Sequence, residues 1–281
     1  MKKNKSSFGG RLLLALTFLF LYAPIIVLIV FSFNDSKSRT IWSGFTLDWY
    51  AKLVSNEMVL SSLSTTLLVS VISAVVATIV GTLAAIGFYN MRKRWRNPLL
   101  MINNIPVMNA DIITGVSLSL LFVFAGGLFG FHLGFGTLLI AHITFNIPYV
   151  ILSVMPKLYQ LDKNLFEAAQ DLGCTWMQAF IKVIIPEISP GIVNGMIIAF
   201  TMSIDDFVIS YFTAGSQVQT LSMTIYAMTR RRVSPEINAI STLLFITVLA
   251  LLVIINLREA SPEKKARLAA KKLSAQPDGG K

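Results

Sequence analysis

The chain has 281 residues, of which 54% are hydrophobic and only 14% are charged, and its mean hydropathy is +0.69. A typical soluble domain carries about 25% charged residues, so this composition excludes a soluble domain and indicates an integral membrane protein. The net charge of +10 indicates no nucleic-acid site, because the basic residues gather between apolar runs. The single cysteine, Cys174, excludes an intrachain disulfide and a multi-cysteine metal site.

Six apolar runs are long enough to cross a bilayer, which takes about 20 helical residues. They predict an all-α polytopic membrane protein with about six transmembrane helices. The runs are Leu12–Phe33, Leu60–Phe88, Leu99–Phe124, Gly136–Met155, Gly191–Phe212 and Ala239–Leu257. The first run follows a basic start but ends without a small-residue cleavage site, so we interpret it as a retained helix and not as a signal peptide.

The distribution of basic residues predicts the orientation. Of the 24 Lys and Arg residues, 18 fall in segments 1–11, 91–97, 157–182 and 258–281. The positive-inside rule places these segments in the cytoplasm. We therefore expect residues 12–257 to form the transmembrane domain. The N-terminus (1–11) and the C-terminal tail (258–281) are expected in the cytoplasm.

Three segments between the runs are expected outside. Segment 34–59 is rich in aromatic residues, which predicts an interfacial belt and a short surface helix. Segment 126–136, GGLFGFHLGFG, predicts a tight glycine-rich turn. Segment 229–239, TRRRVSPEINA, departs from the positive-inside trend. An acidic partner surface and a merely solvated charge run explain it equally well.

The long inside loop, residues 156–190, reads as a helix-turn-helix at the inner face of the membrane. Its beginning is typical of a capped helix, and Gly173 offers a break before a second short helix. Pro186 and Pro190 are expected to limit the continuation of that second helix. Such an element is typical of a docking site for a partner protein.

Within this loop, EAAQDLG is followed after nine residues by VIIP. This pattern resembles the EAA loop of ABC-importer permeases, with Val183 and Ile185 as conservative replacements. The identical positions are Glu167, Ala168, Ala169, Gly173 and Pro186. The resemblance implies a type I ABC-importer permease fold, in which loop 157–190 forms coupling helices that dock in a groove of a separate ATPase. Glu167 would meet a basic group of that ATPase; alternatively, it only complements the dipole of its helix.

Over most of its length, the chain also resembles permeases of the spermidine/putrescine type, specifically the C-type subunit. The segments that carry it are Val30–Asp35, Ala110–Phe122, His142–Val150, Phe200–Ser210 and Val233–Leu243. Asn109 and Ala110 stand where that family often has Ser-Pro. Without the proline, the local bend that the family pattern implies in the run 99–124 is in doubt.

The resemblance also implies the partners. These are a second homologous permease, a dimer of ATPase subunits, an extracytoplasmic polyamine-binding protein and membrane lipid, with no nucleic acid. The chain lacks the phosphate-binding pattern G-x-x-x-x-G-K-[ST]. We therefore expect no cofactor, no metal and no catalytic residue in this chain, with ATP and Mg²⁺ bound by the ATPase partner.

The charged residues inside the runs are three acids, Asp111, Asp205 and Asp206. An ionised aspartate at a helix centre costs about 2.5–3.5 kcal/mol on insertion, so each should face protein or water. The runs contain no Lys or Arg to pair with them, whereas the amines of a polycation would supply partners. Adjacent helical residues point about 100° apart. We therefore predict that Asp111 and one of Asp205 and Asp206 line the substrate pathway, while the other holds helices together or faces the second permease.

Depth along the helices supports one common site. Counted from the inner face, Asp111 and Asp205 each lie about 20 Å along their helices, and His142 falls near the same level. We include His142 in the pathway, although a structural hydrogen bond is the favoured role for it. Tyr226 is a further pathway candidate as a cation–π surface, with aromatic anchoring as the alternative.

The resemblance thus implies a permease subunit of an ATP-driven polyamine importer, forming half of the translocation pathway in the cell membrane. The nearest alternative is the same machine for an iron chelate, thiamine or an anion; the acids argue against an anion. An intramembrane aspartyl protease using Asp111 and Asp205 is disfavoured by the missing Gly-x-Gly-Asp and by the EAA loop. An ion-coupled secondary carrier would be active without any ATPase.

Overall fold

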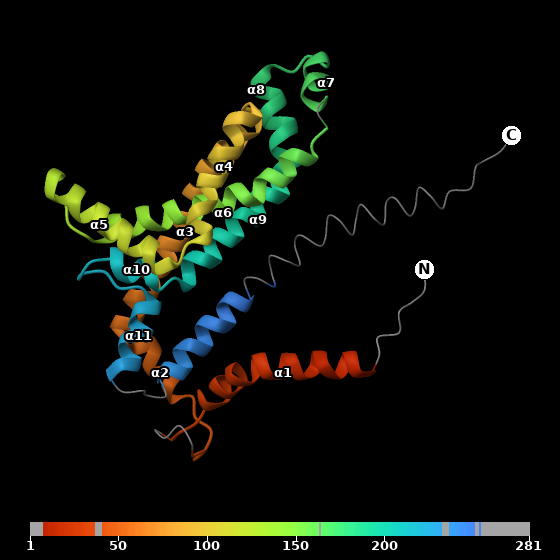
Figure 1. The fold of residues 1–281 in the computed structure, drawn as a ribbon. Helices are drawn as coiled ribbons and strands as arrows, with labels where there is room; N and C mark the ends of the chain where they lie inside the picture. The colour runs from red at the N-terminus through yellow and green to blue at the C-terminus, as the bar shows by residue number, and fades with distance from the viewer. Residues whose placement is uncertain (1–7, 37–40, 163, 232–235, 251–252, 254–281) are drawn as a thin grey trace. The chain divides into compact units, whose positions relative to one another are not determined.

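The computed structural model describes residues 8–36, 41–162, 164–231, 236–250 and 253. Helices dominate this part of the chain (Figure 1). The chain divides into two compact units, and each is described by itself. One unit comprises residues 1–60 and 224–247, and the other comprises residues 61–223 and 248–281.

The larger unit contains most of the helices. Its elements are α3 (Glu57–Asn90), α4 (Lys93–Met108), α5 (Asp111–Phe129), α6 (Phe135–Gln160), α7 (Leu165–Asp171), α8 (Trp176–Ala179), the π-helical turn η1 (Phe180–Ile184), α9 (Ile185–Asp205) and α10 (Val208–Thr213). Helix α3 begins in the smaller unit, and α11 (Leu221–Arg231) ends there.

The smaller unit contains α1 (Phe8–Phe31), α2 (Asp48–Ser55) and a helix over Glu236–Ala250. Helix α2 confirms the short helix predicted in segment 34–59. The expectation of an interfacial belt is wrong for Trp49, which is only 5% exposed. Its indole N–H donates to the carbonyl of Asn34 at 2.8 Å, so this ring is part of the packed interior of the unit.

Five helical stretches of the described residues are long and apolar enough to cross a membrane. They are Leu12–Phe31, Glu57–Asn90, Asp111–Phe129, Phe135–Gln160 and Trp176–Asp205. The helix over Glu236–Ala250 is apolar but shorter, and the sixth predicted run, 239–257, lies partly outside the described residues. The predicted class of a polytopic all-α membrane protein is confirmed.

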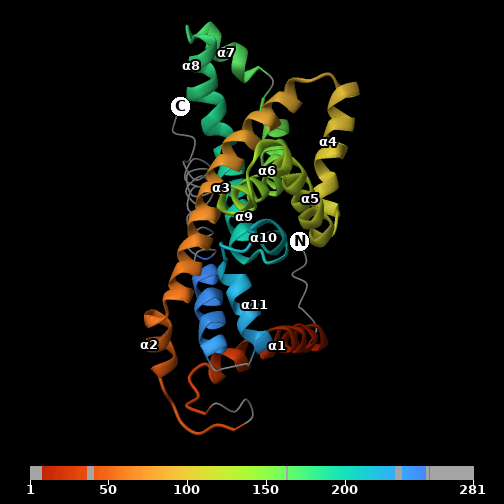
Figure 2. The same ribbon diagram turned by 90° about the vertical axis from the view of Figure 1, so that its left-hand side faces the viewer.

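Helices α3, α6 and α9 form the core of the larger unit and run side by side in two views (Figures 1 and 2). Small residues allow this close approach, because in a membrane the packing of helix surfaces replaces the hydrophobic effect. A Cβ atom at Gly81 of α3 would lie 2.8 Å from Cβ of Val150 in α6. At Gly195 of α9 it would lie 3.2 Å from Cα of the same valine. Val150 is therefore enclosed by two glycine surfaces.

Replacing Gly81 with leucine is expected to destabilise the larger unit by about 1–3 kcal/mol, because the side chain would overpack the α3–α6 contact. Gly87 lies on the same helix with open space around its Cα, so Gly87→Leu is the matched control. The midpoint of thermal unfolding of the purified protein in detergent measures the effect. Equal midpoints for the two variants would contradict the close packing.

The expectation of one helix over 99–124 is wrong. Helix α4 ends at Met108, and Asn109 and Ala110 adopt extended conformations with ψ of 153° and 135° before α5 begins at Asp111. The break forms although no proline stands at 109 or 110. The expected run 191–212 is likewise interrupted, because α9 ends at Asp205 and α10 begins at Val208.

The expectation that prolines limit the second loop helix is also wrong. The helical stretch Trp176–Asp205 is continuous through Pro186 and Pro190. A proline removes one N–H and crowds the carbonyl four residues before it. The π-helical turn η1 ends at Ile184, two residues before Pro186, and the N–H of Ile185 bonds to the carbonyl of Phe180, five residues back. This widened turn makes room for the proline.

Candidate functional site

A pocket of about 280 Å³ opens in the larger unit where the chain breaks between α4 and α5 and between α9 and α10. The apolar runs in the sequence predicted neither break, and residues at both breaks line the pocket. Its lining comprises Pro106, Asp111, Thr114, Phe145, Tyr149, Met202, Asp205, Asp206, Phe207, Val208 and Ile209. Irregular backbone at membrane depth is tolerated where it lines a cavity, so we take this pocket as the candidate site.

Asp111 and Asp205 present exposed carboxylates to this pocket. Asp111 begins α5 and complements the positive N-terminal end of that helix, and Asp205 ends α9. Within the described part of the chain, no other side chain forms a hydrogen bond or ion pair with either carboxylate. The aromatic rings of Phe145 and Tyr149 line the same pocket. Free carboxylates beside aromatic rings suit an ammonium group.

Asp206 also lines the pocket, but its carboxylate is engaged by the protein. Its side chain is 8% exposed. One carboxylate oxygen accepts the N–H of Ile209 at 3.2 Å, and the other accepts the N–H of Ser210 at 2.7 Å. These two bonds satisfy free N–H groups at the start of α10, as a helix-capping carboxylate does.

His142 of α6 is buried and is not among the residues that line the pocket. Its Nε2 lies 3.5 Å from a carboxylate oxygen of Asp206 and 3.0 Å from the hydroxyl of Ser210. Its Nδ1 lies 2.6 Å from the hydroxyl of Ser203 in α9. Of these predicted pathway residues, Asp111 and Asp205 therefore line the pocket, whereas His142 is buried behind it.

Tyr226 belongs to the smaller unit and is described with it. Its ring is 40% exposed, and the guanidinium of Arg230 lies 5.7 Å from the ring centre. Tyr226 is therefore already in contact with a cation of its own helix. Arg232 lies outside the described residues.

The loop between α6 and α9 turns back through a glycine. Helix α7 ends in a Schellman motif, in which the N–H of Cys174 bonds to the carbonyl of Ala169 and the N–H of Gly173 bonds to that of Gln170. Gly173 has a φ of +88°, a conformation that other residues adopt only with strain. The glycine of the EAA pattern therefore has a backbone role.

The remaining residues of the EAA pattern divide between the surface and the interior. Glu167 and Ala168 are exposed on α7, Pro186 is exposed in the first turn of α9, and Ala169 is buried. Large apolar side chains are exposed beside them, a signal that the sequence reading missed. They are Leu172, Trp176, Met177 and Ile181.

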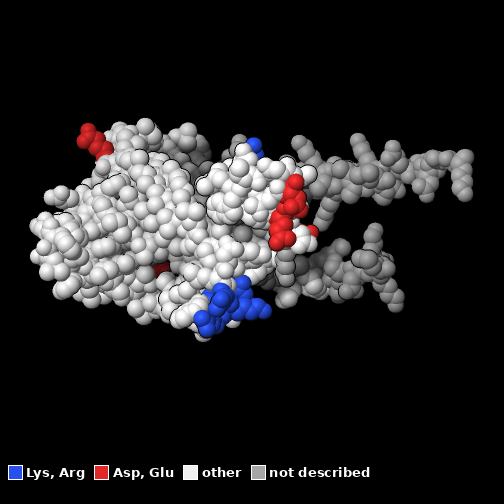
Figure 3. All heavy atoms as spheres, turned by 90° about the horizontal axis from the view of Figure 1, so that it is seen from above, with Lys and Arg blue, Asp and Glu red and all other residues white. Residues whose placement is uncertain are grey.

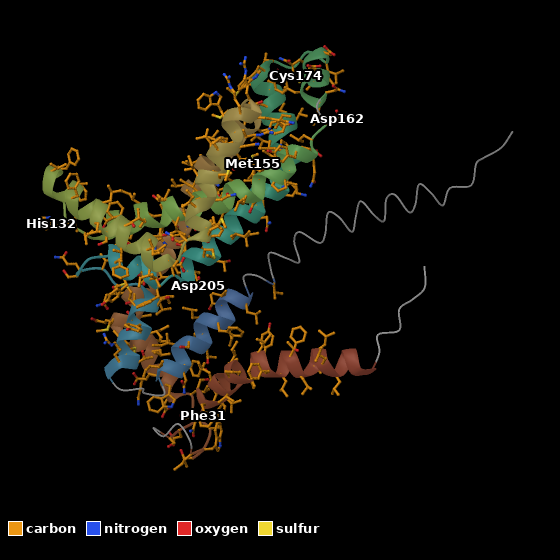
Figure 4. All side chains as sticks on the ribbon, in the orientation of Figure 1. Phe31, His132, Met155, Asp162, Cys174 and Asp205 are labelled. Atoms are coloured by element: carbon orange, nitrogen blue, oxygen red, sulfur yellow. The ribbon has the colours of Figure 1, made fainter. Side chains whose placement is uncertain are left out.

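Exposed apolar groups next to acids are typical of a protein-binding surface. Figure 3 shows acidic side chains gathered at the α7–α8 end, apart from a patch of basic ones. Figure 4 shows Asp205 at the opposite end of α9 from Asp162 and Cys174 of the loop. The candidate pocket and the candidate docking surface therefore lie at opposite ends of the helical stretch Trp176–Asp205.

Residues 77–260 match the family described as binding-protein-dependent transport system inner membrane component. The chain belongs to this family. Two curated relatives of the permease come from Escherichia coli strain K12. The spermidine/putrescine transport system permease protein PotC is 38% identical over 248 residues, which cover 87% of this permease and 92% of PotC. The putrescine transport system permease protein PotI is 38% identical over 235 residues, which cover 83% of this permease and 84% of PotI.

A solved structure confirms the fold of the permease. It is a bacterial alginate ABC transporter in complex with an alginate pentasaccharide-bound periplasmic protein. The TM-score is 0.63, with coverage of 88% of this permease and 90% of that chain. The sequence identity is 18%, so the likeness supports the ABC-importer permease fold alone. The substrate has to be inferred from the pocket and from the closer relatives.

Proposed function

We propose that the chain is a permease subunit of an ATP-driven importer of spermidine and putrescine. The observation that carries this proposal is the pocket with two free carboxylates, Asp111 and Asp205, beside aromatic rings. The names of relatives at 38% identity give the same substrate class. The acids of this lining argue against an anion, and the names of the relatives favour a polyamine over thiamine or an iron chelate.

The pocket chemistry fits one ammonium group of a polyamine at a time. Asp111 and Asp205 would accept charge-assisted hydrogen bonds from the ammonium, and Phe145 and Tyr149 would contact the adjoining methylene groups or the cation. A polyamine carries several amines along a flexible chain. Successive amines can therefore replace one another at the carboxylates, which lets the substrate move without leaving either acid unpaired for long.

The coupling surface fits an ATPase partner. Glu167, Ala168 and the exposed apolar residues of the loop would dock on one subunit of an ATPase dimer that binds ATP and Mg²⁺. A second homologous permease would complete the pathway, and an extracytoplasmic binding protein would deliver the polyamine. This arrangement places loop 157–190 and both termini in the cytoplasm. Movement of the ATPases would pass through the loop to α6 and α9.

The proposal predicts uptake that depends on ATP. Proteoliposomes containing the complete importer, with ATP inside and the loaded binding protein outside, should accumulate labelled spermidine. Replacing ATP with a non-hydrolysable analogue, or omitting the ATPase, should abolish accumulation. Accumulation without the ATPase would contradict the proposal and indicate an ion-coupled carrier. Uptake of labelled thiamine or an iron chelate instead of spermidine would leave the importer and overturn its substrate.

A further inference from the structure

A chain of buried hydrogen bonds joins four helices behind the pocket. The hydroxyl of Ser73 in α3 lies 3.1 Å from that of Ser203 in α9, and the latter lies 2.6 Å from Nδ1 of His142 in α6. Nε2 of the histidine then meets Ser210 of α10 and the carboxylate of Asp206. The two serines next to the histidine and Ser73 are at most 2% exposed, and the histidine is 1% exposed.

Such a network is costly inside a membrane protein unless its members are paired. An ionised Asp206 only accepts hydrogen bonds, so Nε2 of His142 is assigned as the donor. In the neutral imidazole Nδ1 is then the acceptor, and it receives the hydroxyl hydrogen of Ser203. Each ring nitrogen has a role, because the imidazole contacts Ser203 of α9 with one nitrogen and Ser210 of α10 with the other. His142 therefore fixes the position of one helix end relative to the next helix start.

The break between α9 and α10 decides where the two adjacent acids point. Asp206 has an extended ψ of 126°, which ends α9 and turns its carboxylate back onto the N–H groups of α10. Asp205, one residue earlier, is the last helical residue and remains exposed in the pocket. In a continuous helix the two side chains would differ only by the helical rotation. The capped break instead buries one acid and exposes the other.

We propose that His142 and Asp206 are positioning residues that hold this break, so that Asp205 alone of the adjacent pair presents a free carboxylate to the transported ammonium. The proposal rests on the proposed function for the identity of the ammonium. The placement of residue 205 itself does not depend on the substrate. His142 acts from behind the pocket and touches no substrate.

One test separates capping from substrate binding at Asp206. Asparagine keeps one acceptor oxygen for the N–H groups at the start of α10, whereas alanine keeps none. Asp206→Ala should therefore raise the KM for spermidine uptake at least about tenfold, and Asp206→Asn should raise it at least about threefold less than Asp206→Ala does. Asp205→Asn should raise KM at least about tenfold, because it removes the charge itself. If Asp206→Asn and Asp206→Ala raised KM equally, and by as much as Asp205→Asn, the charge of Asp206 and not its capping oxygen would matter. Asp206 would then be a substrate ligand and the proposal would be overturned.

A second test needs no transport. With Cys174 replaced by serine, Asp205→Cys provides one thiol at the pocket position, and its rate of modification by a cationic thiol reagent is measured in the assembled importer. Adding His142→Ala should change that rate at least about fivefold, because thiol reactivity follows exposure. Thr144→Ala is the matched control on α6, since the Thr144 hydroxyl is exposed and bonds to the carbonyl of Ile140 in its own helix.

The two tests distinguish the failure of the positioning role from the failure of the proposed function. If spermidine is not transported but His142→Ala still changes the modification rate, the substrate is wrong and the positioning role stands. An unchanged rate with His142→Ala, in protein that reaches the membrane in normal amount, would overturn the positioning role. The Thr144→Ala rate should equal that of the Asp205→Cys background.

Discussion

Replacing the two pocket acids that have no side-chain partner, Asp111→Asn together with Asp205→Asn, is expected to lower spermidine uptake at least about a hundredfold. This loss applies at a subsaturating concentration of spermidine. A hydrogen bond to a charged group contributes about 1.5–3 kcal/mol, and each 1.4 kcal/mol corresponds to about a factor of ten. The loss of two such interactions accounts for the size of the effect. Initial uptake rates of labelled spermidine measure it, normalised to the amount of protein in the membrane.

The control is an acid outside the pocket. Asp48 begins α2 in the smaller unit and is exposed, so Asp48→Asn changes the net charge of the protein by the same step as one pocket substitution. It should leave the uptake rate unchanged. If the double pocket variant were inserted normally and transported spermidine at the native rate, the carboxylates would not carry the substrate.

Reversing the charge of the loop, Glu167→Arg, is expected to lower uptake at least about tenfold by weakening the docking of the ATPase. The same change should remove the stimulation of ATP hydrolysis by the loaded binding protein, because the signal has to cross the loop. Binding of spermidine by the isolated binding protein is unaffected. The measurement is ATP hydrolysis by the purified importer with and without that protein.

Glu57→Arg is the matched control for the alternative role of Glu167. Glu167 and Glu57 are both exposed and stand in the first turn of a helix, α7 and α3, so both complement a helix dipole. If Glu167 serves only its helix, the two reversals should have similar small effects. A larger loss for Glu167→Arg alone indicates contact with the partner. Equal losses would contradict a specific coupling role.

The sequence predicted the helical membrane fold because long apolar runs have few other structures available in a bilayer. It missed the breaks at Asn109 and at Asp206, because the apolar composition continues through both. Hydropathy measures burial in lipid and says nothing of whether a backbone turn is satisfied by a distant side chain. At Asp206 the carboxylate accepts free N–H groups at the start of the next helix. The hydrophobic periodicity of the sequence does not predict such a bond.

The candidate site was predictable in composition but not in the division of its roles. The absence of basic residues in the runs singled out three acids, and the structure brings all three to one pocket. Which of Asp205 and Asp206 is free depends on the helix break and on His142, more than 60 positions away along the chain. The exposed Leu172 and Trp176 were missed because exposure of an apolar residue in a loop is a property of the folded surface.

The most direct measurement is uptake of labelled spermidine by cells that lack this gene but keep the partner subunits, with the native chain or an empty vector returned to them. The account predicts that the native chain restores uptake, that excess unlabelled putrescine competes with it, and that Asp205→Asn restores little. If the native chain reached the membrane and restored no uptake of either polyamine, the assignment of the pocket to polyamines would be wrong.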